Sequence, residues 1–345
     1  MESGANYELS EVLDTYLLPL RRIENIISEK PNGNILVEAP LGFKELGLEL
    51  VRYLSKKGFN ASLSGRNTWG SCDFSLSSNY DFIIHLGHAL PPNILHIINN
   101  NLKIERHDHG DIVMIRVNDG TNILFSPAYY KPQPELLNKL EDSIQSFVKD
   151  NPNIMVTYAL PYKFYAHHIA SSFKLKIAPN PITGCFVGFP IPNSILFVGS
   201  GYFYPLTFKF LKPHITVYLL DIFRGVLEDI EYVYRKYLSM KVKAINEFIS
   251  AKRVGIIVSR KPGQQRLDLV NSLIIKLRDL GKEVIIVDAD EVSPDVVNNL
   301  PVNAVVNTAC PRIGIDDLDR FMKPIVNAGD VLRQNILDLN NLLSW

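Results

Sequence analysis

The sequence predicts an α/β protein built from two or three parallel-sheet units. Short apolar runs alternate with stretches of helical periodicity along the whole chain, which is typical of parallel sheets covered by helices. The 345 residues exceed what one hydrophobic core comfortably serves. Segments around Cys72 and around Cys185 look like two copies of one unit. We divide the chain into three domains, 1–128, 129–226 and 227–345, each with one cysteine.

The first unit is expected to begin with a helix over residues 8–30, where apolar side chains repeat at helical spacing. A later helix runs through Leu54, and Gly58 is its stop signal. The expected strands of this unit are 34–40, 61–64, 81–87, 112–117 and 122–125.

The second and third units repeat the alternation of strands and helices. In the second unit we expect helices at 133–149 and 162–173 and strands at 154–160, 175–178, 194–201 and 215–220. In the third unit we expect a leading helix at about 225–250, strands at 253–259, 284–287 and 304–306, a helix that ends at Gly281 and a short helix at 294–300. Such alternation favours a parallel sheet in each unit.

Composition excludes several classes of protein. Hydrophobic residues make up 46% of the chain, and 36 basic residues balance 36 acidic ones. A balanced charge predicts neither a nucleic-acid partner nor an anionic membrane partner. No apolar run reaches the roughly 18 residues of a membrane helix, and the N-terminus lacks the basic start and apolar core of a signal peptide. We therefore expect a cytoplasmic protein.

The segments around Cys72 and Cys185 repeat the same spacing between cysteine and strand. The strand after Cys72 begins at Asp81 and the strand after Cys185 begins at Ser194, so both offsets are nine residues (81−72 and 194−185). Each strand ends in a turn that contains glycine. Cys310 differs, because it follows its strand and Pro311 ends that strand.

The three cysteines are candidates for metal ligands. Their odd number argues against a closed set of disulfides, and a lone cysteine is most often a buried core residue. Here, however, each unit has one cysteine in a loop with small neighbours, which leave room for a bulky group beside the sulfur. Three thiolates can hold three irons of a [4Fe–4S] cluster and leave the fourth open. A zinc site of three cysteines and a histidine stays an alternative.

Several blocks resemble a known family. They are Thr68–Asp73 (TWGSCD), Asp81–His88, Gly184-Cys185, Phe197–Gly201 (FVGSG), Lys261–Gln264 (KPGQ) and Asn307–Asp317 (NTACPRIGIDD). In order and spacing they resemble the diphthamide synthesis enzymes of archaeal type, the 2-(3-amino-3-carboxypropyl)histidine synthases. The resemblance runs from about residue 34 to about residue 332, and the last block is its most specific part.

The resemblance implies a fold, a cofactor and a reaction. The family has three similar Rossmann- or flavodoxin-like α/β domains in pseudo-threefold arrangement around a central [4Fe–4S] cluster, and it forms a homodimer. By match, Cys72, Cys185 and Cys310 would be the cluster ligands and so the catalytic residues. An electron donor would reduce the cluster, and S-adenosylmethionine would bind at its unique iron. A 3-amino-3-carboxypropyl radical would then add to a histidine of translation elongation factor 2.

Some further residues are expected near S-adenosylmethionine. A turn rich in glycine lets the backbone approach a ligand closely. The backbone amides at the start of a helix can bind the ligand's carboxylate. An arginine side chain can form an ion pair with the same carboxylate. The alternatives without a ligand are a tight turn at the end of a strand, an ordinary helix N-terminus and a structural ion pair. The residues concerned are Gly199, Ser200 and Gly201 for the turn, Gly263 and Gln264 for the helix start, and Arg312 for the pair.

Two histidines near a strand end and one position that differs from the family pattern are also of interest. His85 and His88 should point to opposite faces of their strand, so one of them can face the cluster while a core role is the simpler reading. Tyr204 stands where the resemblance leads us to expect a histidine, which leaves the role of that position open. The alternatives to the transferase are an enzyme resembling quinolinate synthase and a non-catalytic partner subunit.

Overall fold

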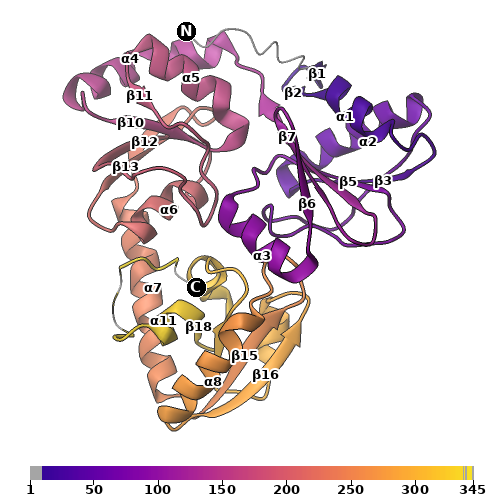
Figure 1. Ribbon diagram of the computed structural model, residues 1–345. Helices are drawn as coiled ribbons and strands as arrows, with labels where there is room; N and C mark the ends of the chain where they lie inside the picture. The colour runs from indigo at the N-terminus through magenta and orange to yellow at the C-terminus, as the bar shows by residue number, and fades with distance from the viewer. Residues whose placement is uncertain (1–9, 337, 339, 344–345) are drawn as a thin grey trace.

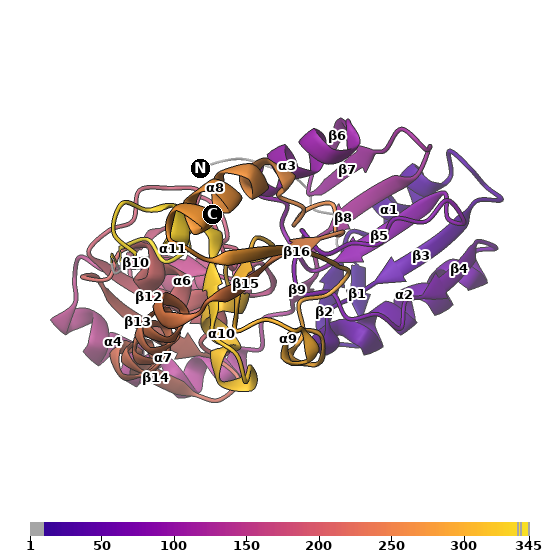
Figure 2. The same cartoon turned by 90° about the horizontal axis from the view of Figure 1, so that it is seen from below.

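The computed structural model of the chain describes residues 10–336, 338 and 340–343. Three mainly parallel sheets form three lobes (Figure 1), with the first lobe in indigo, the second in magenta and the third in orange to yellow. The long helix α7 (Glu231–Ser250) runs from the second lobe into the third. The view from below has the third lobe in front, with the first lobe on the right (Figure 2).

The three sheets share one strand order. In each, the first strand along the chain lies between the second and the third, and a further parallel strand lies beside the third. The orders are β4-β3-β5-β8, β11-β10-β12-β13 and β16-β15-β17-β18. This common topology confirms the predicted α/β fold of three similar units, and it explains why the two segments around Cys72 and Cys185 have equal spacing.

The elements of the first unit are as follows. Its sheet contains β3 (Asn34–Glu38), β4 (Asn60–Leu63), β5 (Phe82–Leu86) and β8 (Asn122–Ser126), extended by the antiparallel strands β7 (Ile112–Arg116) and β6 (Glu105–His109). Its helices are α1 (Leu20–Ile27), α2 (Lys44–Lys56) and α3 (Pro92–Leu102), with a short 3-10 helix at Leu41–Phe43. Gly58, with φ of +93°, ends the turn after α2 as the sequence predicts.

The second and third units have these elements. The second holds α4 (Pro134–Asp150), β10 (Met155–Tyr158), α5 (Lys163–Ser172), β11 (Lys176–Ile177), β12 (Ser194–Gly199), α6 (Phe203–Leu211), β13 (Thr216–Asp221) and β14 (Val226–Asp229). The third holds α7, β15 (Arg253–Ser259), α8 (Val270–Asp279), β16 (Glu283–Ala289), α9 (Pro294–Asn299), β17 (Ala304–Asn307), α10 (Ile313–Asp316), β18 (Ile325–Asn327) and α11 (Ala328–Leu332). Short 3-10 helices lie at Leu160–Tyr162, Leu267–Leu269 and Leu318–Arg320.

Apolar side chains bury the faces of these sheets. In the first unit one cluster includes Val37 and Leu50, and a second, on the side of α3, includes Ile83 and Ile98. The second unit has one large cluster, to which Leu342 near the end of the chain also belongs. The central strands are therefore continuous apolar runs, as expected for parallel strands buried on both faces. The domain boundaries stay a prediction, with β14 continuing the second sheet to Asp229.

The predicted helix over residues 8–30 is wrong in its first part. Residues 8 and 9 lie outside the described residues, and β1 (Ser10–Val12) and β2 (Tyr16–Leu18) form a hairpin before α1. The turn holds Leu13 and Asp14 at positive φ. β2 pairs with β9 (Tyr129–Tyr130), more than 100 residues further along, and such long-range pairing overrides a local period.

Among the described helices, none combines the length and apolar character that a membrane crossing requires. The longest of them, α7, is amphipathic: its buried face includes Tyr234 and Ile245, and charged side chains such as Arg235 lie on its exposed face.

Candidate functional site

One cavity of about 60 Å³ brings the three cysteines together. Cys72 comes from the loop that precedes β5, Cys185 from the equivalent loop that precedes β12, and Cys310 from the loop that follows β17. Each unit thus contributes one thiol, although these residues are more than 100 positions apart in the sequence. The cavity is otherwise lined mostly by apolar side chains, including Ile94, Leu160 and Ile182.

Local hydrogen bonds fix the Cys310 turn. The Asn307 side chain donates to the carbonyl of Cys310 at 2.7 Å and accepts from the backbone N–H of Ala309 at 3.0 Å. The Asn327 amide, at the end of the neighbouring strand β18, donates to the Pro311 carbonyl at 2.7 Å. Because Pro311 cannot donate to a ladder, the strand ends at this point and the thiol lies at its carboxyl end.

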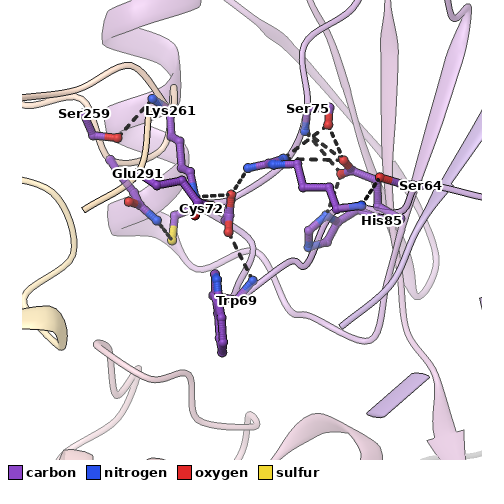
Figure 3. A network of polar contacts seen from close by, with 12 residues as sticks. Ser64, Trp69, Cys72, Ser75, His85, Ser259, Lys261 and Glu291 are labelled. Carbon is purple, nitrogen blue, oxygen red and sulfur yellow. Dashed lines mark hydrogen bonds and ion pairs between the residues drawn. The ribbon is translucent and has the colours of Figure 1, made fainter. Parts of the chain in front are cut away.

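The Cys72 loop is held by Asp73, whose side chain is fully buried. Asp73 accepts from the backbone N–H of Trp69 at 3.3 Å and pairs with the guanidinium of Arg66. Lys261 of the third unit approaches the same carboxylate at 3.0 Å and also contacts Glu291 at 3.0 Å. Figure 3 shows this network, which continues from Lys261 past Cys72 to His85. It ties the Cys72 loop to the third unit.

The electrostatics of the thiols are those of buried groups that lie near each other. Burial raises the pKa of Cys310 to about 12, with a further contribution from Cys185. Burial raises the pKa of Cys72 well above its ordinary value, and the neighbouring Cys310 and Cys185 raise it further. Burial likewise raises the pKa of Cys185, opposed by Asn93 and Arg312. A group that takes three thiolates here would therefore displace three protons on binding.

The predicted residues Gly263 and Gln264 contact Cys72 directly. A Cβ on Gly263 would lie 2.5 Å from the Cα of Cys72, so only glycine allows this approach of two backbones. The Gln264 side chain is 6% exposed, and its Nε2 lies 3.3 Å from the Cys72 Sγ. Their contact with S-adenosylmethionine stays a prediction.

Arg312 lines the cavity, but its guanidinium is already engaged. Its NH1 donates to the carbonyls of Gly184 at 2.9 Å and Phe203 at 2.7 Å and to the Thr207 hydroxyl at 3.0 Å. Asp316 binds its other nitrogens. The residue is 3% exposed and its guanidinium carbon lies 3.8 Å from the centre of the Phe203 ring. These contacts favour the structural reading, and a ligand carboxylate stays a prediction.

The glycine turn lies apart from this cavity. Gly199 ends β12, Ser200 is exposed, and Gly201 has φ of +66°. Ser200 instead hydrogen-bonds the Tyr162 hydroxyl. The turn is absent from the described cavity lining, and its proposed contact with S-adenosylmethionine stays a prediction.

The two histidines lie against each other, so the prediction that they face opposite ways is wrong. Gly87, with φ of +78°, turns the chain between them. The His85 Nδ1 lies 3.2 Å from Glu38, and its Nε2 lies 2.9 Å from the Nδ1 of His88. His85 is fully buried and satisfied, whereas His88 lines the cavity. His85 therefore lies between the Glu38 carboxylate and the His88 ring.

The pKa values agree with this arrangement. Burial, with the neighbouring His85, lowers the pKa of His88 to about 3. Burial alone would raise the pKa of Glu38, but hydrogen bonds from His85 and Ser75 lower it overall. His88 is therefore neutral at physiological pH, and Glu38 is ionised.

Sequence reasoning missed the aromatic part of the lining. Trp69, Phe203 and Tyr204 line the cavity, and Trp69 is 63% exposed. Trp69 precedes Cys72 by three residues, and a tryptophan in the same short loop as a candidate ligand is the signal that could have identified it. Phe203 and Tyr204 start α6, a helix that we did not predict. Tyr204, which stands in place of the expected histidine, is packed against Phe197 and Phe203.

The donor set fits a cluster. Three thiols from three units share one cavity, and in the described part of the chain no three His, Cys, Asp or Glu side chains lie close enough to hold a single metal ion. A [4Fe–4S] cluster needs no such point of convergence, because each thiolate binds a different iron. Cys72, Cys185 and Cys310 are the residues that would hold it.

Comparison with known proteins identifies the relationship. The family model of diphthamide synthesis proteins matches residues 39–332. The 2-(3-amino-3-carboxypropyl)histidine synthase of Methanocaldococcus jannaschii is 27% identical over 89% of this chain and 85% of its own, and that of Pyrococcus horikoshii is 25% identical over 86% and 84%. The crystal structure of Dph2 from Pyrococcus horikoshii with a 4Fe-4S cluster has the same fold, with a TM-score of 0.74 at 21% identity over 97% of this chain and 95% of that one. The chain belongs to the diphthamide synthesis family.

Proposed function

We propose that this protein carries out the first step of diphthamide synthesis. It would transfer the 3-amino-3-carboxypropyl group of S-adenosylmethionine to a histidine of translation elongation factor 2. The observation that carries the proposal is the meeting of three cysteines, one from each repeated unit, in a single cavity. The synthase names of its curated relatives support the same reaction class.

Cys72, Cys185 and Cys310 are proposed to hold a [4Fe–4S] cluster. When bound, such a cluster supplies the electron that breaks a carbon–sulfur bond of S-adenosylmethionine. The contribution of the chain is placement, because the choice among the three bonds to a sulfonium depends on which one faces the electron source.

The cavity lining suits that task. Phe203 and Tyr204 add apolar surface beside Cys185 and Cys310, which keeps water away from a reactive carbon centre. Trp69 stands exposed beside the cavity and offers a ring face to a cationic substrate. His88 is neutral and adds no positive charge to the cavity. A sulfonium substrate that also carries an ammonium group would be repelled by an imidazolium at this position.

Elongation factor 2 and an electron donor are the proposed protein partners, and the chain is proposed to act as a cytoplasmic homodimer. The test is anaerobic incubation of the reconstituted protein with elongation factor 2, S-adenosylmethionine and dithionite. We expect methylthioadenosine and an aminocarboxypropyl adduct on a histidine. Formation of 5′-deoxyadenosine instead would refute the bond choice. Iron uptake without either product would favour a non-catalytic partner subunit.

A further inference from the structure

The side chain of Gln264 approaches a candidate cluster ligand from another unit. Gln264 lies in the loop between β15 and α8, and its amide Nε2 is 3.3 Å from the Sγ of Cys72, 192 residues earlier in the chain. The side chain is 6% exposed, so water competes little for the amide. This contact differs in kind from the expected contact with S-adenosylmethionine.

The loop that carries Gln264 is fastened on both sides. The Asn101 side chain, at the end of α3, donates to the carbonyls of Pro262 at 2.8 Å and Gln265 at 3.1 Å. Lys261 pairs with Asp73, the residue next to Cys72. Gly263 packs against the Cys72 backbone. The chain around Gln264 is thus anchored at residues 261, 262, 263 and 265, which fixes the direction in which its side chain leaves the backbone.

The chemistry of the contact depends on the charge of the sulfur. A glutamine NH₂ group can only donate, and a thiolate is a far stronger acceptor than a thiol. A ligand sulfur of an iron–sulfur cluster becomes more negative when the cluster is reduced. An N–H···S hydrogen bond therefore stabilises the reduced form more than the oxidised form, and such bonds help set the reduction potentials of these clusters.

A second sulfur has a weaker contact of the same type. The amide Nδ2 of Asn93 lies 3.9 Å from the Sγ of Cys185, at the limit of a hydrogen bond to sulfur. Among the side-chain amide contacts described for the cysteines, that of Gln264 is the shorter one. The effect should therefore be concentrated at Cys72.

We propose that Gln264 donates a hydrogen bond to the Cys72 thiolate and thereby raises the reduction potential of the bound [4Fe–4S] cluster. This rests on the proposed function only in that a cluster is bound. Gln264 is a positioning and tuning residue that acts through Cys72.

The test compares the midpoint potentials of anaerobically reconstituted wild type, Gln264→Met and Gln264→Asn, followed by EPR during a redox titration. Met keeps the length of the side chain without a donor, and Asn keeps the amide but moves it back by one methylene. We expect both variants to shift the potential to more negative values. A loss of about threefold to tenfold in the equilibrium constant for reduction is reasonable for one such bond, which is at most about 59 mV for one electron.

The neighbouring Gln265→Met provides the matched control, and its potential should equal that of the wild type. A wild-type potential in both Gln264 variants would overturn the proposal. So would a weaker affinity for S-adenosylmethionine with an unchanged potential, because Gln264 would then be a substrate contact. A wild-type protein that binds no iron would instead refute the proposed function, so the two failures are distinguishable.

Discussion

The first and second units are joined to the third by different kinds of contact. Several contacts hold the Cys72 loop. Asp73 pairs with both Arg66 and Lys261. Gly263 and Gln264 of the third unit also contact Cys72 itself. Among the described hydrogen bonds, those from the third unit to the Cys185 loop come from one side chain, Arg312, which binds the carbonyl of Gly184 and the start of α6. Both contacts come from loops that follow adjacent parallel strands, β15 and β17.

This difference shows how one sheet edge can position two loops. The carboxyl ends of parallel strands lie at the same edge, where open α/β sheets place their ligands. The third unit uses this edge to hold the cysteine loops of the other two units and to present its own Cys310. The Cys72 loop, which has several contacts with the third unit, should lose little stability when one of them is removed. The Cys185 loop should lose more when Arg312 is replaced.

We expect the largest effect from removing the cysteine sulfurs that these contacts hold in position. Replacement of Cys72, Cys185 or Cys310 by serine, one at a time, should abolish turnover and reduce the iron content after reconstitution. The measurements are iron and sulfide analysis and adduct formation by mass spectrometry. A serine variant that keeps full activity would remove that cysteine from the ligand set.

The next effect tests the contact with the second unit. Arg312→Ala would remove the guanidinium that binds Asp316 and three acceptors of the second unit in a buried site, where only the Gly184 carbonyl keeps a second donor, Thr207. We expect a loss of about 3–5 kcal/mol in the free energy of unfolding, measured by urea denaturation. Arg312→Lys should recover only part of this, because an ammonium cannot reproduce the planar fork.

Lys261→Met is the matched change in the contact with the first unit. Asp73 keeps Arg66 as a partner, so we expect a loss of only about 1–2 kcal/mol in the same urea experiment. Equal losses for Lys261→Met and Arg312→Ala would contradict the contrast between shared and single contacts.

Gly263→Ala tests the close approach of two backbones. The new Cβ would lie 2.5 Å from the Cα and 2.7 Å from the carbonyl oxygen of Cys72. The loop must move, and we expect a cost of about 1–3 kcal/mol in unfolding free energy together with reduced iron uptake. Gly65→Ala serves as the control, because its Cβ would meet no atom within 4 Å. If the two variants behave alike, the packing of Gly263 on Cys72 is unimportant.

The last effect concerns pH. His88 has a folded pKa of about 3 against an ordinary value of 6.5, so between these values the unfolded chain binds the additional proton. Stability should therefore be lost as the pH falls below 6.5, and down to about 3 the loss should grow. Urea denaturation of the iron-free protein at pH 7 and pH 5 should show this loss, and His88→Gln should reduce it.

The groups that face His88 in this network, His85 and Glu38, remain in the variant. His96→Gln, on the exposed face of α3, provides the control and should keep the pH dependence of the wild type. An unchanged pH dependence in His88→Gln would show that His88 is not the buried neutral group described here.

Much of the fold could be predicted from the sequence because buried parallel strands are continuous apolar runs. The strands around Val37, Ile84, Phe197 and Val306 were found in this way. The hairpin at β1 and β2 was not, because its pairing with Tyr129 and Tyr130 is set by tertiary structure. Helices α3 and α6 were missed because prolines suggested turns, although Pro92 occupies the start of α3, where proline is favourable.

The site was predictable only in part. Spacing and small neighbours pointed to the cysteines, and the structure brings them into one cavity. The partners of Arg312 in the second unit lie 105 to 128 residues away in the sequence, and no local pattern can reveal such contacts. The pairing of His85 with His88 depended on the turn at Gly87, whose positive φ is not evident from strand periodicity.

The most direct test of the central claim is diffraction from the anaerobically reconstituted protein at the iron absorption edge. The account predicts one compact anomalous feature in the cavity between Cys72, Cys185 and Cys310, with each sulfur bound to a different iron. Iron bound elsewhere, or held by only two of these cysteines, would contradict it.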